Sequence, residues 1–164
     1  MPFEHLEEKE AVMKAALIEI NGYRFYSHLA DTVEDRETKE ALKKLARDEK
    51  KHLKVIETVF FPEAGFSEQI TEEELAMEES MEKTGEADIF TRRVNVEGLV
   101  RVLDSPRRAL ILALDTERYS VEFFEGLAEK STAPEERDVC QRLADEEKNH
   151  VRIIEGMLEK TPKD

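Results

Sequence analysis

Two stretches of the chain place a glutamate three residues before a histidine. Glu49 precedes His52 in the stretch RDEKKHL, and Glu147 precedes His150 in the stretch DEEKNHV. Residues three apart on a helix lie on one face, so each carboxylate and its imidazole can reach the same point. Carboxylates and imidazoles are both ligands for divalent transition metals. Each stretch is therefore a candidate half of a metal site.

Either stretch alone is weak evidence, because glutamate fills 30 of the 164 positions and a solvated charged helix face explains one motif equally well. An internal repeat strengthens the case, because the chain aligns with itself without a gap when it is shifted by 98 residues. Duplication of a helical hairpin would also give such a repeat without function. At this glutamate frequency, chance would place a glutamate at all four of the positions 19, 49, 117 and 147 roughly once in a thousand times. The aligned pairs are Glu19 with Glu117, Glu49 with Glu147, and His52 with His150.

Four long segments with helical periodicity must position these residues. They cover about 4–33, 35–59, 105–130 and 134–160, and the third has Ser105 as a natural N-cap before Pro106. Short links join these segments into two antiparallel hairpins, about 4–59 and 105–160. A crossover at about 60–104 connects the hairpins. It contains the acidic helical piece TEEELAMEESMEKTG and the apolar piece VEGLVRVL. The sequence predicts one all-α domain over 1–164, a ferritin-like four-helix bundle with one long crossover between its second and third helices.

The bundle would bring four carboxylates and two imidazoles around two cations. One glutamate from each of two helices and a Glu-x-x-His from each of the other two is the arrangement of di-iron and di-manganese bundles. Four carboxylates balance two divalent ions, whereas without metal their burial would cost on the order of several kcal/mol unless they were protonated. The predicted metal ligands are Glu19, Glu49, His52, Glu117, Glu147 and His150.

Composition excludes several other classes of function. A formal net charge of −14 argues against nucleic acid as a partner, because phosphate contacts need clustered lysine and arginine. The chain has no run of 18 apolar residues and no apolar signal region at its N-terminus, so we expect a soluble, cytoplasmic protein with no membrane association. The single cysteine, Cys140, excludes an internal disulfide and a cysteine-based metal cage. His5 and His28 lack a preceding glutamate at this spacing, and we expect both at the surface.

The stretches EINGYRFYSHLA with DEKKH, and ERYSVEFFEGLA with EEKNH, resemble the ferritin-like domain of the rubrerythrin family. The resemblance covers all four helices. It implies a non-haem centre of two iron ions, with manganese or zinc as substitutes, held by the six residues above. It also implies bridging roles for Glu49 and Glu147 and more terminal roles for Glu19 and Glu117. By the same resemblance we expect an oxidoreductase of oxidative stress that reacts with hydrogen peroxide or dioxygen, and a homodimer.

Two departures from the family's pattern change these expectations. The chain lacks the two Cys-x-x-Cys pairs of a rubredoxin-like module, so its electrons must come from a separate donor protein such as a rubredoxin. Ser120 stands where rubrerythrins carry an extra glutamate, which puts the associated iron shift and full peroxidase competence in doubt. An iron-binding protein of ferroxidase type, without peroxidase turnover, is the alternative function. A structural bundle with a vestigial site is a third.

Residues around the ligands supply further candidates. Asp48 and Glu146 directly precede the motif glutamates, and each could accept a hydrogen bond from the histidine of the other motif, Asp48 from His150 and Glu146 from His52. An acid at the surface beside a lysine is an equally good interpretation. Tyr23 and Tyr26 lie on the face of Glu19, and Tyr26 resembles a family tyrosine that forms a hydrogen bond near the metal, although core packing is the commoner role.

Overall fold

The computed structural model describes residues 2–64, 89–92 and 94–163, and their side chains from residue 8 to 62 and from residue 89 onward within those ranges. Four long helices dominate these residues: α1 (Pro2–Thr32), α2 (Arg36–Val59), α6 (Pro106–Lys130) and α7 (Pro134–Lys160). Their bounds agree with the four segments that the sequence predicts to within about two residues. The acidic helix expected at 71–85 lies outside the described residues.

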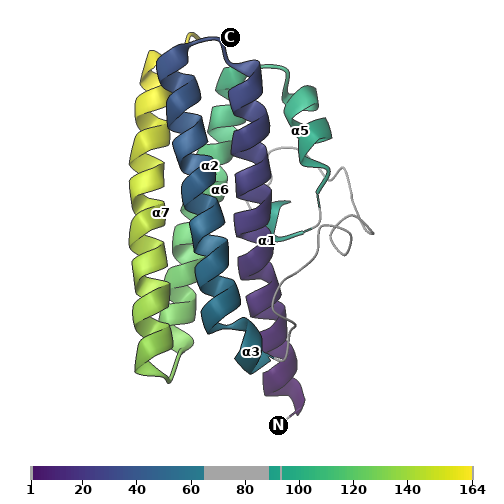
Figure 1. Ribbon diagram of the computed structural model, residues 1–164, viewed down its shortest axis with the longest axis vertical. Helices are drawn as coiled ribbons and strands as arrows, with labels where there is room; N and C mark the ends of the chain where they lie inside the picture. Colours follow the sequence, from purple (N-terminus) through teal and green to yellow (C-terminus); the bar gives the residue numbers. More distant parts are fainter. Residues whose placement is uncertain (1, 65–88, 93, 164) are drawn as a thin grey trace.

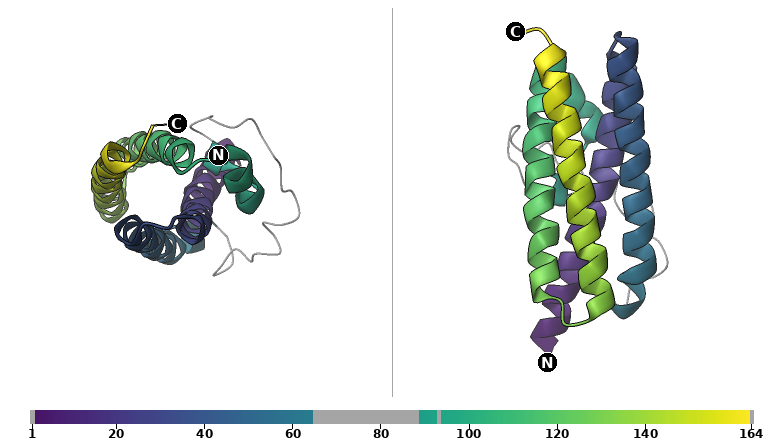
Figure 2. Two further views of the ribbon diagram at one scale, coloured as in Figure 1. Left: turned by 90° about the horizontal axis from the view of Figure 1, so that it is seen from above. Right: turned by 90° about the vertical axis from the view of Figure 1, so that its left-hand side faces the viewer.

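The four long helices form an all-α bundle of two antiparallel hairpins, α1 with α2 and α6 with α7 (Figure 1). Seen from above, they make a ring, and α5 (Val96–Leu103) lies outside it beside α1 (Figure 2). Helices α2 and α6 run in the same direction, so the chain must return along the length of the bundle between them. That return explains why the crossover is long, as in ferritin-like bundles.

Side chains at the helix starts explain where the helices begin. Asp35 precedes α2 and accepts hydrogen bonds from the backbone N–H of Thr38, at 2.8 Å, and from its hydroxyl. Ser105 caps α6 by accepting from the N–H of Arg108, and Pro106 occupies the first turn, where no N–H is needed. Each cap satisfies a donor that the helix itself cannot.

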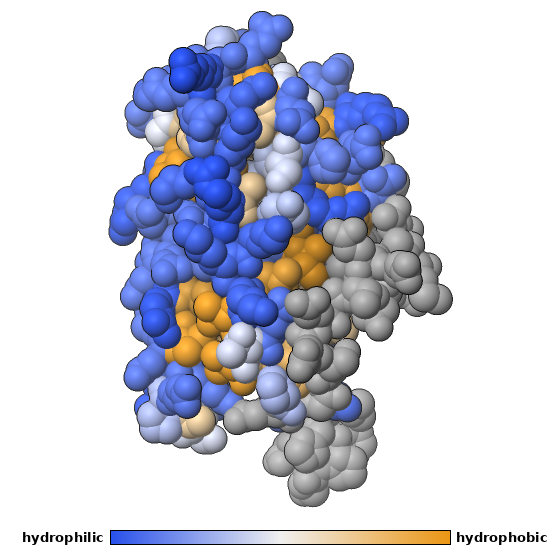
Figure 3. All heavy atoms as spheres, in the orientation of Figure 1, coloured by the Kyte–Doolittle hydropathy of each residue, from blue (hydrophilic) through white to orange (hydrophobic). Residues whose placement is uncertain are grey.

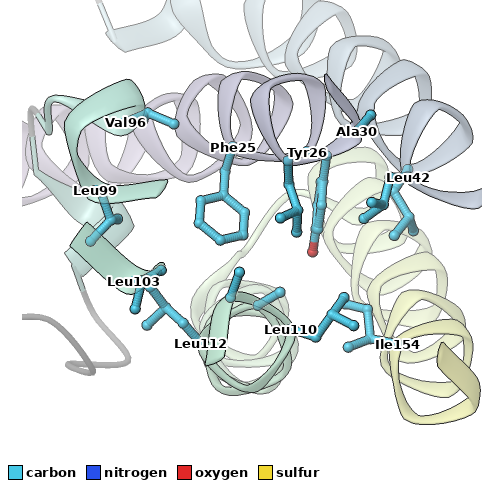
Figure 4. Close-up of a cluster of buried hydrophobic side chains, with 14 of the residues drawn as sticks. Phe25, Tyr26, Ala30, Leu42, Val96, Leu99, Leu103, Leu110, Leu112 and Ile154 are labelled. Atoms are coloured by element: carbon cyan, nitrogen blue, oxygen red, sulfur yellow. The ribbon is translucent and has the colours of Figure 1, made fainter. Parts of the chain in front are cut away.

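The described part of the crossover covers the outer side of α1. It contains α3 (Phe61–Ala64), the short 3₁₀ helix η1 (Ile89–Thr91) and α5, which matches the apolar piece VEGLVRVL. Asn21 of α1 donates from Nδ2 to the carbonyl oxygens of Phe90, at 2.9 Å, and Arg92, at 2.7 Å. Leu99 and Leu103 of α5 lie in the same apolar cluster as Phe25 of α1 (Figure 4). This packing closes the side of α1 that faces away from the bundle.

Two further predictions concern membrane-spanning helices and the single cysteine. Every helix among the described residues is too short or too polar to cross a membrane. Cys140 is a free, buried thiol on α7, and burial raises its pKa to about 11. A thiol with a raised pKa is a poor nucleophile at neutral pH, which is consistent with a packing role.

Candidate metal centre

The six predicted ligands come together in the middle of the bundle. Helix α1 contributes Glu19, and α6 contributes Glu117. Each of the other two helices contributes a glutamate and a histidine one turn apart, Glu49 with His52 from α2 and Glu147 with His150 from α7. All six side chains are buried, with exposed fractions of at most 4%. Ionisable groups this deep in a protein require partners or a metal.

The ligand atoms form two groups that interlock. In the first group, one ligand atom from each of Glu19, Glu49, His52 and Glu147 lies within 4.8 Å of the others. In the second group, atoms of Glu49, Glu117, Glu147 and His150 meet the same limit. Glu49 and Glu147 belong to both groups, and each group adds one further glutamate and one histidine. The cluster therefore has the composition of two adjacent metal positions that share two carboxylates.

Both histidines point the same ring nitrogen into the cluster. His52 Nδ1 lies 3.2 Å from Glu147 Oε1 and 3.4 Å from Glu19 Oε2. His150 Nδ1 lies 2.8 Å from Glu49 Oε1, 3.0 Å from Glu147 Oε2 and 3.4 Å from Glu117 Oε1. The two imidazole rings are nearly parallel, with centroids 5.5 Å apart. Each Nδ1 is thus available to a cation inside the cluster.

The other ring nitrogens reach acids on the opposite hairpin. His52 Nε2 lies 2.5 Å from Glu146 Oε2, and His150 Nε2 lies 3.2 Å from Asp48 Oδ2. The crossed pairing of these acids with the histidines is therefore present in the structure. Asp48 also accepts from Lys44 Nζ at 2.9 Å, so its charge is divided between two partners. Such acids fix the tautomer of a ligand histidine and direct its free nitrogen at the metal.

The two candidate tyrosines have different surroundings. The Tyr26 hydroxyl points from α1 into the bundle (Figure 4) and donates to Glu117 Oε1 at 2.5 Å. Burial, together with the charge of Glu117, raises the pKa of Tyr26, which keeps the hydroxyl protonated as a donor. Tyr23 is half-buried, and the ammonium of Lys50 lies 5.3 Å from its ring centroid. Among the described residues, Tyr23 forms no hydrogen bond to a carboxylate of the cluster.

Burial and mutual repulsion shift the ionisation of the cluster. Desolvation raises the pKa of Glu19, Glu49 and Glu117 well above the usual range, and the charge of Glu147 raises each of them further. Burial also opposes ionisation of Glu147, but the close imidazoles of His150 and His52 lower its pKa well below the usual range. Burial and repulsion therefore favour protonation of Glu19, Glu49 and Glu117, whereas the histidines favour the ionised form of Glu147.

The histidines take up protons for the same reason. Burial disfavours the charged imidazolium of His52, yet the hydrogen bond and charge of Glu147 outweigh it and raise its pKa to about 9. Burial disfavours the charged form of His150 too, but the nearby carboxylates of Glu117, Glu147 and Glu49 outweigh it and raise its pKa. These shifts favour protonated imidazoles in the metal-free cluster, so a cation would have to displace protons.

Unpaired polar atoms show that the residues fit a pair of cations. Five buried carboxylate oxygens, from Glu19 (both oxygens), Glu49, Glu117 and Glu147, have no hydrogen-bond partner among the described residues. His150 Nδ1 also forms no hydrogen bond there, although three carboxylates lie within 3.4 Å. Native proteins rarely bury so many unsatisfied atoms together. Two divalent ions would supply the missing partners and neutralise four carboxylates.

Gly22 is a residue of the site that the spacing of acids and histidines did not reveal. A Cβ atom added to Gly22 would lie 3.0 Å from Glu49 Oε2, so the absence of a side chain makes room for this shared carboxylate. Glycine within a helix costs about 1 kcal/mol relative to alanine. The sequence offers one sign of this role, which is a glycine one turn after Glu19 within a predicted long helix.

His28 lies apart from the cluster. His28 is half-buried rather than exposed, because the neighbouring cavity that it lines is walled by α5 residues including Glu97 and Val100. The side chain of His5 lies outside the described residues. His28 belongs to no group of candidate ligands among the described residues.

Comparisons with known proteins agree with this geometry. The sequence model of the family described as rubrerythrin matches residues 10–158. A hypothetical protein from Pyrococcus furiosus has a similar fold, with 20% identity, 92% of this chain and 88% of the other covered, and a TM-score of 0.64. An uncharacterized conserved protein from Magnetospirillum magnetotacticum MS-1 is also similar, with 23% identity, coverage of 95% and 96%, and a TM-score of 0.63. No curated protein matches. The match over most of its length shows that the chain belongs to the rubrerythrin family.

Proposed function

We propose that this protein is a non-haem di-iron-carboxylate oxidoreductase that reduces hydrogen peroxide or dioxygen with electrons from an external donor. The observation that carries the proposal is the pair of ligand groups that interlock through Glu49 and Glu147. A member of the rubrerythrin family with six buried ligands in this composition is suited to a pair of iron ions. Manganese or zinc would fit the same donors and are the alternatives that metal analysis must exclude.

Each residue of the centre has a distinct task in this proposal. Glu19 and His52 would hold one ion, and Glu117 and His150 the other. Glu49 and Glu147 would bridge both. Iron held by these residues would supply redox chemistry for the reduction of hydrogen peroxide, in which one peroxide, two electrons from the donor and two protons give two water molecules.

The surrounding chain contributes position and protons. Glu146 and Asp48 hold the histidines in the tautomer whose Nδ1 is free for a cation. Tyr26 holds Glu117 in place and carries a proton at Oη in the interior of the bundle. Burial of all six ligands excludes bulk water, so these contacts act in a medium of low dielectric constant.

Metal content, optical spectra and turnover test this proposal together. The purified protein should hold two iron ions per chain and show oxo-bridge absorption that bleaches on reduction. Hydrogen peroxide or dioxygen should restore that absorption in the reduced protein. Stoichiometric zinc or manganese, or a reduced protein that neither oxidant reoxidises, would contradict the proposal.

One observation favours a second candidate, an iron-handling protein of ferroxidase type. Ser120 occupies the position of the family's extra glutamate, and its hydroxyl donates within its own helix to the carbonyl oxygen of Thr116 at 2.9 Å. It thus offers no additional carboxylate to the centre. Oxidation of added Fe(II) by dioxygen, without catalytic reduction of peroxide, would identify this second function.

A further inference from the structure

The exposed face of α2 carries a row of positive side chains. We call it the α2 basic stripe, and it consists of Lys43, Lys44, Arg47, Lys50, Lys51 and Lys54, all of them exposed. The spacing 43, 47, 50 and 54 follows one face of the helix, and 44 and 51 lie beside it. The surface along the upper and middle part of α2 is hydrophilic in Figure 3. The stripe is therefore a continuous solvent-facing feature.

The charge of α2 is opposite to that of the chain. The helix has eight lysine and arginine residues and five aspartate and glutamate residues, a net charge of +3. The whole chain has a net charge of −14, so the remaining residues sum to −17. Its repeat mate α7 has five basic and eight acidic residues, a net charge of −3. A positive patch on such a chain would attract a negatively charged partner to one face.

The stripe borders a cleft that leads to the candidate metal centre. This cleft of about 550 Å³ lies between α2 and α7, and both ligand histidines line it. Lys44 and Lys51 of the stripe form part of its α2 wall, and Arg142 and Glu146 belong to its α7 wall. His52 and His150 turn their outer nitrogens toward two lining acids of this cleft. The imidazole ring of His52 or His150 would separate a partner bound in this cleft from the carboxylates of the cluster.

The acids in the cleft are already engaged with partners. Asp48 pairs with Lys44 and His150, and Glu146 pairs with His52. Asp145 lies 3.6 Å from Lys148 Nζ. By contrast, Arg47, Lys51 and Lys54 of the stripe form no ion pair with any residue that the structure describes. The charge left available to a partner on this side is therefore positive.

We propose that the α2 basic stripe is the docking surface for an acidic one-electron carrier protein, which delivers electrons to the centre through His52 and His150. This inference rests on the proposed function, because it names the donor class for that reaction. Two reduced carriers each give up one electron. The two electrons, with two protons, convert one hydrogen peroxide to two water molecules. Electron transfer weakens steeply with distance, and the cleft brings a docked protein next to the rings of His52 and His150.

Charge reversal on the stripe tests the proposal with the iron-loaded full chain. The probe is a reduced rubredoxin of net negative charge, whose oxidation in the presence of hydrogen peroxide is followed by stopped flow. The variant is Arg47→Glu/Lys51→Glu/Lys54→Glu, which spares Lys44 because it contacts Asp48. The matched control is Lys9→Glu/Lys130→Glu/Lys163→Glu, which changes three exposed residues elsewhere and lowers the net charge by the same six units. Circular dichroism and iron content verify that both variants fold.

We expect the second-order rate constant to fall at least about tenfold in the stripe variant and less than about threefold in the control. The wild-type rate should also decline with ionic strength, and the stripe variant should lose most of that dependence. Equal losses in the two variants would overturn the proposal. Self-association of the wild type that only the stripe variant abolishes, seen by sedimentation, would instead assign the stripe to a second copy of the chain.

Two measurements separate failure of this inference from failure of the proposed function. Protein reduced with stoichiometric dithionite and then mixed with peroxide reports the chemistry without a carrier. Zinc-substituted rubredoxin, which cannot transfer an electron, reports binding to the stripe without the chemistry. Normal reoxidation with no stripe-dependent binding would reject the docking surface alone. Stripe-dependent binding without reoxidation would reject the oxidoreductase alone.

Discussion

The two hairpins of this bundle are alike where they face each other and different where they face outward. The α1–α2 hairpin and the α6–α7 hairpin contribute equivalent ligands at a spacing of 98 residues, all of them buried. On the outside, α2 is basic and α7 is acidic. The six candidate ligand positions are thus equivalent in type between the hairpins, whereas the charge at the surface is not.

Differences close to the cluster make its two halves unequal. Tyr26 donates to Glu117, but the equivalent residue of the second hairpin is Phe124, which has no hydroxyl. Gly22 leaves room for Glu49, whereas Ser120 stands at the equivalent position. The Glu117–His150 half therefore has a donor that the Glu19–His52 half lacks. We expect the two positions to differ in their affinity for metal. Variants of residues that are equivalent or different between the hairpins test this expectation.

The largest effect is expected when a shared carboxylate is removed. Glu49→Gln should reduce metal content from two ions per chain to less than one, because Glu49 belongs to both ligand groups. Glu19→Gln removes a ligand from one group only and should retain about one ion. Metal analysis after removal of free metal by gel filtration measures both. Equal metal loss in the two variants would contradict the division into shared and unshared ligands.

Stability provides the control for this prediction. The raised pKa of Glu49 favours its protonated form in the metal-free protein, and glutamine resembles a protonated carboxyl group in shape and polarity. Glu49→Gln should therefore change the free energy of unfolding of the metal-free protein by less than about 1 kcal/mol. The metal-loaded wild type should unfold at a much higher temperature than either metal-free form, because bound metal stabilises the native state.

The helices and the convergence of the six candidate ligands were predictable from sequence because both depend on spacing. Ser105 and Pro106 mark the start of α6, and the 98-residue repeat distinguishes Glu19 and Glu117 from the many other glutamates of the chain. The role of Gly22 was not predictable, because it depends on how closely α1 approaches the Glu49 carboxylate in space. Spacing also could not separate Tyr23 from Tyr26, since both lie near the face of Glu19 and only packing determines which hydroxyl turns inward.

The acids that contact the histidines come next in expected effect. Glu146→Gln should weaken metal binding by about 10- to 100-fold, because His52 loses the charged partner that fixes its tautomer. Asp48→Asn should have a smaller effect, since its contact to His150 is longer, at 3.2 Å, and its charge is shared with Lys44. Competition with a chromophoric chelator measures both affinities. A larger loss of metal affinity in Asp48→Asn than in Glu146→Gln would contradict this ranking of the two acids.

The pH dependence should distinguish the metal-free protein from the loaded one. His52 has a pKa raised to about 9, so its contribution to stability is complete below about pH 6.5 and is lost as the pH rises through about 9. The raised pKa values of Glu19, Glu49 and Glu117 act in the same direction, whereas the stability that comes from the lowered pKa of Glu147 is already complete above about pH 4.5 and does not change in this range. The metal-free protein should therefore become less stable from pH 6.5 to 9 in chemical denaturation.

Metal binding should show the corresponding release of protons. His52 is protonated at neutral pH and must lose a proton before Nδ1 can bind an ion, so loading should release at least one proton per chain. Each released proton raises the apparent affinity by about tenfold per pH unit. Calorimetric titration with Mn²⁺ in two buffers of different ionisation enthalpy measures the number. An affinity that does not change between pH 6 and 8 would contradict the protonated cluster.

The smallest effect is expected from Tyr26→Phe, which makes this position the same in both hairpins. Loss of the hydroxyl removes one hydrogen bond to Glu117 and should weaken one of the two ions by about 1 kcal/mol, or roughly fivefold, while the other ion is unaffected. Tyr23→Phe is the matched control, because the ring of Tyr23 packs beside Lys50 and donates no hydrogen bond to a carboxylate of the cluster among the described residues. Removal of metal by a chelator should be biphasic in the wild type and closer to a single phase in Tyr26→Phe. If the two phases persisted unchanged, the inequality of the halves would have to arise from Gly22 and Ser120 rather than from the tyrosine.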